Sequence, residues 1–177
     1  MDDESFEPGE ALATLPLPVA VVSAAAGGTR SCSTGTLTYV SYSPPLVATP
    51  LNVASRTYEL LRASGEFSLS LLADSQADLA VRAAAPSKGD KFAEQQIAVA
   101  APPAGMLAPG VAGAAAVLWC ALESAVETGR SILCVGRVIV WRGGGASPLL
   151  RLGRRYRRLG AVLEVEDGDE GEAGYPL

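Results

Sequence analysis

The sequence predicts a mainly β protein, an antiparallel β-barrel with helical insertions. Short apolar runs rich in β-branched residues recur along the chain, and Gly, Pro and Ser turn signals separate them. Only two segments have the composition of substantial helices. A doubly wound sheet would alternate strand and helix throughout, so local antiparallel connections are favoured instead.

The acidic chain ends are expected to flank one domain. Residues 1–14 form an acidic N-terminal arm that leads into a short helix or turn, and residues 164–177 form an acidic flexible tail, because neither segment has enough apolar surface to offset the entropy of ordering. The domain between them spans residues 15–163. With 177 residues, 49% of them hydrophobic, the chain can bury one sizeable core.

The strands are expected as successive hairpins. Gly27 and Gly28 form a turn in the first hairpin, Pro44 and Pro45 interrupt the ladder between the next two strands, and a Thr-Gly-Arg turn joins the last pair. The expected strands are residues 19–24, 29–33, 37–41, 46–51, 67–72, 115–127 and 131–141.

Two helices interrupt this pattern. Ser55 is a plausible N-cap for a helix that continues through Ser64, with Gly65 as its terminator. A second helix is expected over residues 75–85 and stops before Pro86, and a loop follows.

Composition excludes several classes of function. The formal net charge of -5 argues against nucleic acid as the main partner. The chain has no histidine, which excludes Ser-His-Asp and Cys-His catalysis. A bound cofactor that performs the chemistry is therefore favoured.

The cysteines provide evidence on metal binding and on the cellular compartment, and the hydropathy provides evidence on membrane association. Cys32, Cys120 and Cys134 are widely separated, and without histidine they do not suggest a metal site. Their odd number and the lack of a signal-like start favour the cytoplasm. No apolar run is long enough to span a bilayer, so no membrane association is expected.

A small-residue turn is the first candidate binding segment. Ser33, Thr34, Gly35 and Thr36 place hydroxyl groups around a glycine, which lets the backbone approach a flat or anionic ligand. An ordinary polar strand end is the alternative interpretation.

The second candidate segment is the start of the first helix. Asn52, Ser55, Arg56 and Thr57 follow a strand, and free amides at a helix N-terminus favour an anion. The alternative is a simple N-cap with a solvent-facing arginine.

Two charged segments complete the candidate set. Lys91 and Phe92 end a charged loop, and arginines gather near the end of the chain at positions 151, 154, 155, 157 and 158. Such a run is usually a solvated face, although beside a phosphorylated ligand it can also receive negative charge.

Together these segments resemble the flavin reductase family of FMN-binding split barrels. That family has a Cys-Thr-x-x-Ser turn, a Ser-x-x-Pro-Pro-Leu strand and a Ser-x-Thr helix start, which correspond to parts of RSCSTGTLTYVSYSPPLVATPLNVASRTYELLR at residues 30–62. KGDKF at 88–92 resembles its Asp-Lys-Phe segment, and LLRLGRRYR at 149–157 resembles its Pro-Leu-x-x-x-x-Gly-x-Tyr stretch. The resemblance extends over about residues 18–160.

The resemblance implies a split β-barrel and a set of flavin contacts. The turn at 33–36 would contact the isoalloxazine, and the helix start would hold the phosphate. The implied cofactor-binding residues are Ser33, Thr34, Gly35, Thr36, Leu51, Asn52, Ser55, Arg56, Thr57, Lys91, Phe92, Arg130, Arg155 and Tyr156. Arg130 stands where the family has a histidine near the nicotinamide, and Gly35 and Thr36 also depart from the family pattern. No catalytic side chain is assigned, because the flavin performs the chemistry.

The implied activity is NAD(P)H-dependent reduction of FMN or FAD, with NADH or NADPH as hydride donor. The resemblance further implies a homodimer that supplies reduced flavin to a partner monooxygenase. Two alternatives remain open at this point. One is a protein of the same fold whose tightly bound flavin acts on another small molecule, and the other is a non-catalytic dimeric binding module.

Overall fold

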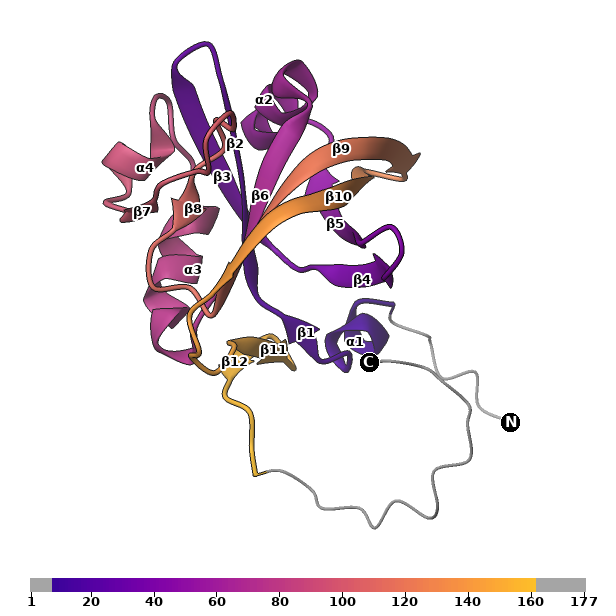
Figure 1. Ribbon diagram of the computed structural model, residues 1–177. Coiled ribbons are helices and arrows are strands. Elements are labelled where there is room, and N and C mark those ends of the chain that lie inside the picture. Colours follow the sequence, from indigo (N-terminus) through magenta and orange to yellow (C-terminus); the bar gives the residue numbers. More distant parts are fainter. Residues whose placement is uncertain (1–7, 162–177) are drawn as a thin grey trace.

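The main sheet of the protein contains seven strands in the order β3-β2-β6-β9-β10-β5-β4, and every neighbouring pair is antiparallel (Figure 1). The computed structural model describes residues 8–161. The strands are β2 (Ala20–Ala26), β3 (Thr29–Gly35), β4 (Thr38–Ser41), β5 (Leu46–Asn52), β6 (Glu66–Leu71), β9 (Ala116–Thr128) and β10 (Ser131–Gly143). This arrangement confirms the predicted mainly β antiparallel fold.

Two small sheets accompany the main one. The first contains β1 (Leu17–Pro18), β11 (Leu150–Leu152) and β12 (Arg155–Arg157), and the second pairs β7 (Val99–Ala100) with β8 (Gly110–Val111). The sequence analysis did not predict these five strands, because two or three residues carry no detectable periodicity. The arginine-rich segment at 150–157, for which no strand was expected, is the β11–β12 hairpin.

The helices lie around the sheet (Figure 1). They are α1 (Pro8–Ala13), α2 (Arg56–Ser64), α3 (Ala77–Ala84) with a short 3-10 turn at Asp74–Gln76 before it, and α4 (Lys91–Glu94). The expectation of a loop that ends in Lys91 and Phe92 was wrong. Asp90 caps a helical turn that begins at Lys91, because its side chain accepts hydrogen bonds from the amides of Phe92 and Ala93.

Helix α2 begins and ends where the sequence predicts. The Ser55 hydroxyl accepts a hydrogen bond from the Tyr58 amide at 3.2 Å. Gly65 adopts φ 73°, a left-handed conformation that glycine reaches without strain, and its amide donates to the Leu61 carbonyl. These caps fix the direction of the helix and present its N-terminus toward β3.

The sheet curls until its edge strand β3 faces β5. The Thr49 hydroxyl donates a 2.8 Å hydrogen bond to the Thr36 carbonyl just after β3, and Gly35 lies against the Pro50 carbonyl. We call this contact line the seam. An edge strand leaves backbone donors and acceptors unpaired on its free side, so the seam offers polar groups to a ligand.

Two clusters of buried side chains hold the sheet and helices together. Trp119 and Phe92 belong to a cluster with residues of α3 and α4, whereas Phe67 and Leu61 belong to a cluster beneath α2. Burial of each large apolar side chain stabilises the folded state by about 1.5–3 kcal/mol relative to leaving that side chain exposed. Gly136 permits this packing, because a Cβ there would overlap the Phe67 ring.

Within residues 8–161, no helix is both long and apolar enough to cross a membrane. That same range contains no group of three or more His, Cys, Asp or Glu side chains placed to hold a metal ion. The expected short helix near the N-terminus is α1. The rest of the expected arm, residues 1–7, and the expected tail at 164–177 lie outside the described residues.

Candidate functional site

A polar hollow lies between β3, the N-terminus of α2 and the segment that follows α3. Its volume is about 280 Å³. It brings together five of the predicted site residues. It is lined by Ser31, Cys32, Ser33, Ser55, Arg56, Thr57, Ala84, Ala85, Pro86, Ser87 and Lys91.

Hydroxyl groups join β3 to α2 on one wall of this hollow. Thr57 is buried, and its Oγ1 lies 2.9 Å from the Ser33 Oγ and 3.1 Å from the Ser31 Oγ. Ser31 was not in the predicted set. The signal that would have found it is strand alternation, since Ser31 and Ser33 share one face of β3.

Lys91 is the buried cation of the hollow. Its side chain is buried, and its Nζ donates a 2.8 Å hydrogen bond to the Cys32 carbonyl. Burial lowers the pKa of Lys91. No carboxylate in residues 8–161 forms an ion pair with it. A buried ammonium is costly unless an anion pairs with it, so this hollow is suited to an anionic group.

The thiol beside Lys91 is not a nucleophile. Burial raises the pKa of Cys32 to about 11, and the neighbouring Lys91 only partly offsets this effect. The thiol therefore stays protonated near neutral pH.

Asp90 and Phe92 anchor α4 and thereby position Lys91. Asp90 accepts a 2.7 Å hydrogen bond from the Arg30 Nε, and the Arg30 guanidinium lies over the Phe92 ring at 5.5 Å from its centroid. Burial alone would raise the pKa of Asp90, but the hydrogen bonds from Arg30 and the α4 amides hold it below its usual value. Phe92 itself packs in the core and does not line the polar hollow.

A second, more apolar hollow lies next to the first along β3, and we call it the seam hollow. Its volume is about 180 Å³. Its wall contains four predicted residues, three of them from the small-residue turn. It is lined by Leu17, Pro18, Val19, Thr34, Gly35, Thr36, Pro50, Arg151 and Tyr156.

The hydroxyls of the seam hollow differ in their partners. Thr34 donates a 2.6 Å hydrogen bond to the Ala80 carbonyl, which ties β3 to α3. The Thr36 hydroxyl is buried and has no hydrogen-bond partner in the described part of the chain. A buried hydroxyl without a partner is unfavourable, so the Thr36 side chain is suited to a polar ligand atom.

Three predicted residues lie outside both hollows, near the start of α2. Leu51 is buried in the core. Asn52 is exposed, and its Oδ1 accepts a hydrogen bond from the Ala54 amide at 2.9 Å. Arg130 occupies the β9–β10 turn, where its carbonyl accepts a 3.5 Å hydrogen bond from the Val53 amide. The structure therefore places Arg130 beside the β5–α2 turn.

Arg155 also lies outside both hollows. Successive residues of a strand point to opposite faces, so Arg155 on β12 points away from the face of its neighbour Tyr156. Arg151, which pairs with Tyr156 across the hairpin, shares the face of Tyr156 and lines the seam hollow. The sequence analysis did not single out Arg151, because its role depends on the register of the hairpin.

The residues that line the two hollows fit a phosphorylated flavin. The polar hollow offers two cationic side chains, hydroxyls and the N-terminus of α2, and the seam hollow offers an apolar wall, a tyrosine and an unpartnered hydroxyl. The family model described as the flavin reductase like domain matches residues 12–160. This chain belongs to the flavin reductase-like family.

Curated relatives of the chain have related descriptions. The reductase subunit Stc3 of stachydrine N-demethylase from Rhizobium meliloti is 30% identical over 154 residues, which cover 84% of this chain and 65% of that protein. A probable flavin reductase from the same organism is 29% identical, and the match covers 48% of its length. The NADH:riboflavin 5'-phosphate oxidoreductase of Streptomyces pristinaespiralis is 32% identical over 145 residues, 80% of each chain.

Solved structures share the fold. The NADH:FAD oxidoreductase SgcE6 of Streptomyces globisporus C-1027 superposes with a TM-score of 0.80 at 27% identity, over 91% of this chain and 97% of that one. The styrene monooxygenase flavin reductase of Pseudomonas putida S12 has a TM-score of 0.75 at 27% identity, over 89% and 100%. These matches confirm the predicted flavin reductase-like split barrel.

Proposed function

We propose that this protein is an NAD(P)H-dependent flavin reductase that binds FMN or FAD at the seam. The observation that carries the proposal is that a cationic polar hollow and an apolar hollow adjoin each other along β3. A flavin nucleotide has one part that suits each hollow, a phosphate for the cationic polar hollow and a flat ring for the apolar one. Relatives named as oxidoreductases of riboflavin 5'-phosphate and of FAD support both flavins as candidates.

The phosphate end would be held in the polar hollow. Lys91 supplies a buried positive charge, and Arg56 supplies an exposed one at the start of α2. The N-terminal amides of α2 add the positive end of the helix dipole. Thr57 would contribute by keeping Ser31 and Ser33 in place through its two hydroxyl contacts.

The ring end would be held in the seam hollow. Thr36 has a hydroxyl available for a polar ring atom, and Tyr156 offers an aromatic surface for stacking. Gly35 lines this hollow without a side chain, and a Cβ there would lie 3.7 Å from the Pro50 carbonyl oxygen and 3.9 Å from the Val22 side chain. When bound, the flavin supplies the ring that accepts a hydride from the nicotinamide, and the chain binds and orients it.

We further propose that the protein is a cytoplasmic homodimer that delivers reduced flavin to a monooxygenase. Exposed aromatic and apolar side chains on β4 and β10, among them Tyr39, Ile139 and Trp141, support an interface between copies. Relatives that are named as a demethylase reductase subunit and as a styrene monooxygenase flavin reductase support an oxygenase partner. The three cysteines are free and buried, which suits a reducing compartment.

The test is oxidation of NADH and NADPH by the purified protein with added FMN, FAD or riboflavin, measured against the same mixtures without protein. Turnover well above that background is the expected result. A protein that is purified with a yellow chromophore but does not reduce added flavin would instead indicate a tightly bound flavin that acts on another substrate. A colourless protein with no turnover would indicate a binding module.

A further inference from the structure

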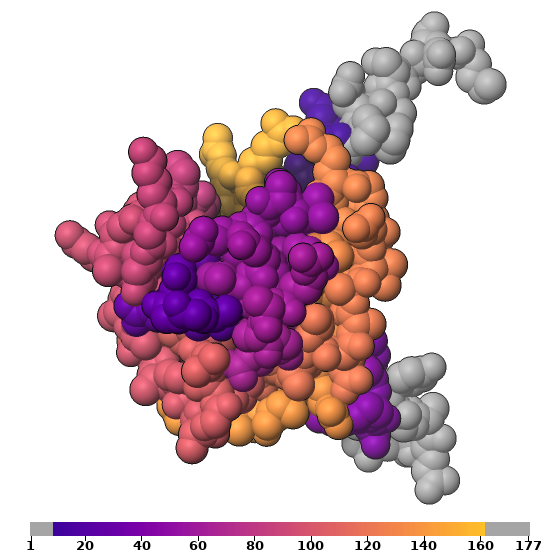
Figure 2. Space-filling model, turned by 90° about the horizontal axis from the view of Figure 1, so that it is seen from above, coloured from indigo at the N-terminus to yellow at the C-terminus, as the bar shows by residue number. Residues whose placement is uncertain are grey.

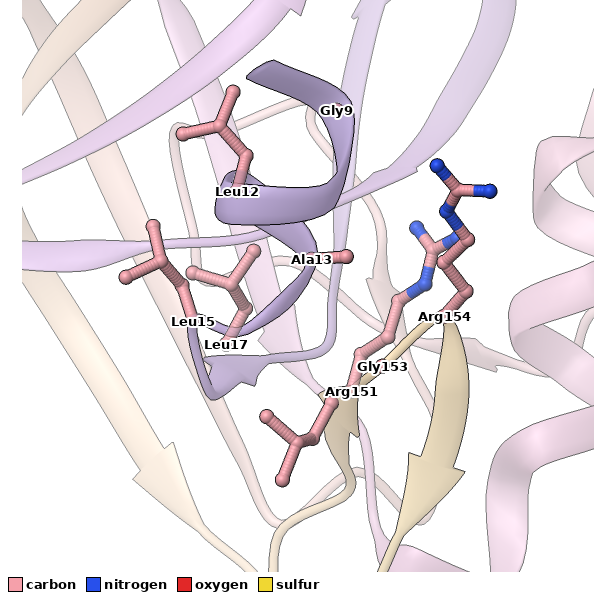
Figure 3. A pocket seen from close by; sticks show the side chains of 9 residues that line it. Gly9, Leu12, Ala13, Leu15, Leu17, Arg151, Gly153 and Arg154 are labelled. Carbon is pink, nitrogen blue, oxygen red and sulfur yellow. The ribbon is translucent and has the colours of Figure 1, made fainter. Parts of the chain in front are cut away.

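A cleft that the flavin site does not use lies between α1 and the β11–β12 hairpin (Figure 3). Its volume is about 210 Å³. The Gly153 amide at the tip of the hairpin donates a 2.9 Å hydrogen bond to the Ala13 carbonyl, which holds α1 against the hairpin. The cleft is lined by Gly9, Leu12, Ala13, Leu15, Leu17, Arg151, Leu152, Gly153 and Arg154.

This cleft continues the seam hollow. Leu17 and Arg151 line both of them, so the two spaces meet at these side chains. A ligand whose ring occupies the seam hollow can therefore extend past Arg151 into the cleft. The polar hollow lies in the other direction, beside Ser31, Cys32 and Ser33 in the middle of β3.

The cleft combines apolar walls with positive charge. Leu12 and Leu15 of the α1 segment are exposed there. Figure 3 shows the side chains of Arg151 and Arg154 extending in the same direction, toward α1. Neither arginine forms an ion pair within residues 8–161. Glu10 faces Arg154 across an adjoining hollow without approaching to 4.0 Å.

The backbone conformation at Arg154 is unfavourable for an arginine, so the turn itself does not explain why an arginine occupies this position. Gly153 and Arg154 have φ values of 58° and 62° in the two-residue turn between β11 and β12. Turns with two positive φ values favour Asn-Gly or Gly-Gly, and a long side chain at the second position is unfavourable. The guanidinium of Arg154 nevertheless reaches α1, where a Cβ on Gly9 would lie 3.6 Å from its Nη2.

We propose that this cleft binds the adenosine diphosphate end of a dinucleotide whose ring end lies in the seam hollow. Arg151 and Arg154 contact the phosphates, and the leucines pack against the adenine. NAD(P)H carries this group next to its redox ring. FAD carries it too, but FAD would place it here only if its flavin phosphate lies outside the polar hollow. The inference rests on the proposed function, since it assumes a redox ring in the seam hollow.

The first test is the binding of ADP itself, measured by isothermal titration calorimetry. Wild-type protein is expected to bind ADP. The Arg154→Gly variant is expected to bind ADP about tenfold or more weakly, because a charge-assisted contact is lost. Arg157→Ala is the matched control. It removes the same charge from the same hairpin, but Arg157 lies on the other face and lines no part of the cleft, so ADP affinity should stay within about twofold.

The choice of glycine separates binding from folding. Glycine adopts positive φ without strain, so Arg154→Gly should have a melting temperature no lower than that of wild type. FMN lacks adenosine, so its affinity should be the same in wild type and Arg154→Gly. A loss of ADP affinity with unchanged stability and unchanged FMN affinity supports the proposal.

Further arms identify the source of the group. If the group belongs to NAD(P)H, Arg154→Gly raises the KM for the nicotinamide with FMN as acceptor. If it belongs to FAD, the variant lowers FAD affinity only. Absence of ADP binding to wild type, or equal loss in Arg154→Gly and Arg157→Ala, would overturn the proposal.

A contact between protein copies is the competing explanation for the exposed leucines. If Leu12→Asp changes the molecular mass in sedimentation and leaves ADP affinity unchanged, the proposal is also overturned. The ADP titration does not depend on turnover. ADP binding without any flavin reduction by wild type would therefore reject the proposed function and leave the cleft assignment standing.

Discussion

Replacement of Lys91 by methionine isolates the buried charge of the polar hollow. Methionine keeps a long flexible stem and removes the ammonium group. Lys91 is only 7% exposed, donates to the Cys32 carbonyl, and has no carboxylate partner in residues 8–161. If its partner is the flavin phosphate, Lys91→Met should weaken FMN much more than riboflavin, because only FMN carries a phosphate.

The size of the effect follows from the burial of the group. A hydrogen bond to a charged group contributes about 1.5–3 kcal/mol, which corresponds to a loss of FMN affinity of about 10- to 100-fold. The cost to the fold is smaller. The variant leaves the Cys32 carbonyl without its donor but also removes a desolvated charge, so the free energy of unfolding should change by about 1 kcal/mol or less.

The assay is quenching of flavin fluorescence on titration with protein, for FMN and for riboflavin. Lys88→Met is the control, because Lys88 is exposed, lies three residues away and does not line the polar hollow. Equal weakening of FMN and riboflavin by Lys91→Met, or unchanged FMN affinity in a folded variant, would refute the phosphate assignment.

Three further predictions concern the hydroxyls and the thiols. Thr57→Val leaves the Ser31 and Ser33 hydroxyls without their common partner, so urea denaturation should show a loss of about 1–3 kcal/mol, most of which Thr57→Ser restores. A Thr57→Val variant as stable as wild type would contradict this. Thr36→Val removes a buried hydroxyl that has no partner within residues 8–161, so the melting temperature should hold or rise while FMN and riboflavin affinities fall equally. Preferential loss of FMN would contradict the assignment of Thr36 to the ring. Burial raises the pKa of Cys120 from 9.0 to about 12. Above pH 9 the unfolded chain therefore releases a proton that the folded protein keeps. The free energy of unfolding should then fall by up to about 1.4 kcal/mol per pH unit. Cys120→Ala should show a shallower decline in urea midpoints between pH 9 and 11, and an unchanged slope would argue against this cause.

The local elements of the fold were predictable because their signals are local. Ser55 and Gly65 bound α2 as expected, since an N-cap hydroxyl and a left-handed glycine act on the adjacent backbone. The hairpin turn at Gly27 and Gly28 is also where the sequence indicates. The hairpin β11–β12 was missed, because strands of three residues that are mostly exposed have no hydrophobic pattern.

In the candidate site, too, the sequence indicated the local features and missed the contacts between distant residues. The sequence indicated the turn at 33–36 and the helix start at 55–57, whose residue types and spacing are typical of anion and ring binding. It did not indicate that Thr57 joins Ser31 and Ser33, nor that Phe92 packs in the core while Lys91 lines the hollow. These relations join residues far apart in the chain.

By itself, the sequence determined the strand-rich architecture, the polar segments that line the two hollows, and the absence of histidine chemistry. Those properties depend on residue type and on spacing over a few positions. Only the tertiary structure decided which charges are buried and which face the same space. The curl that brings β3 to β5 forms the seam, and the register that places Arg151 opposite Tyr156 aims Arg151 at the seam hollow while Arg155 points away. Burial and register depend on contacts across the whole chain, so no local pattern encodes them.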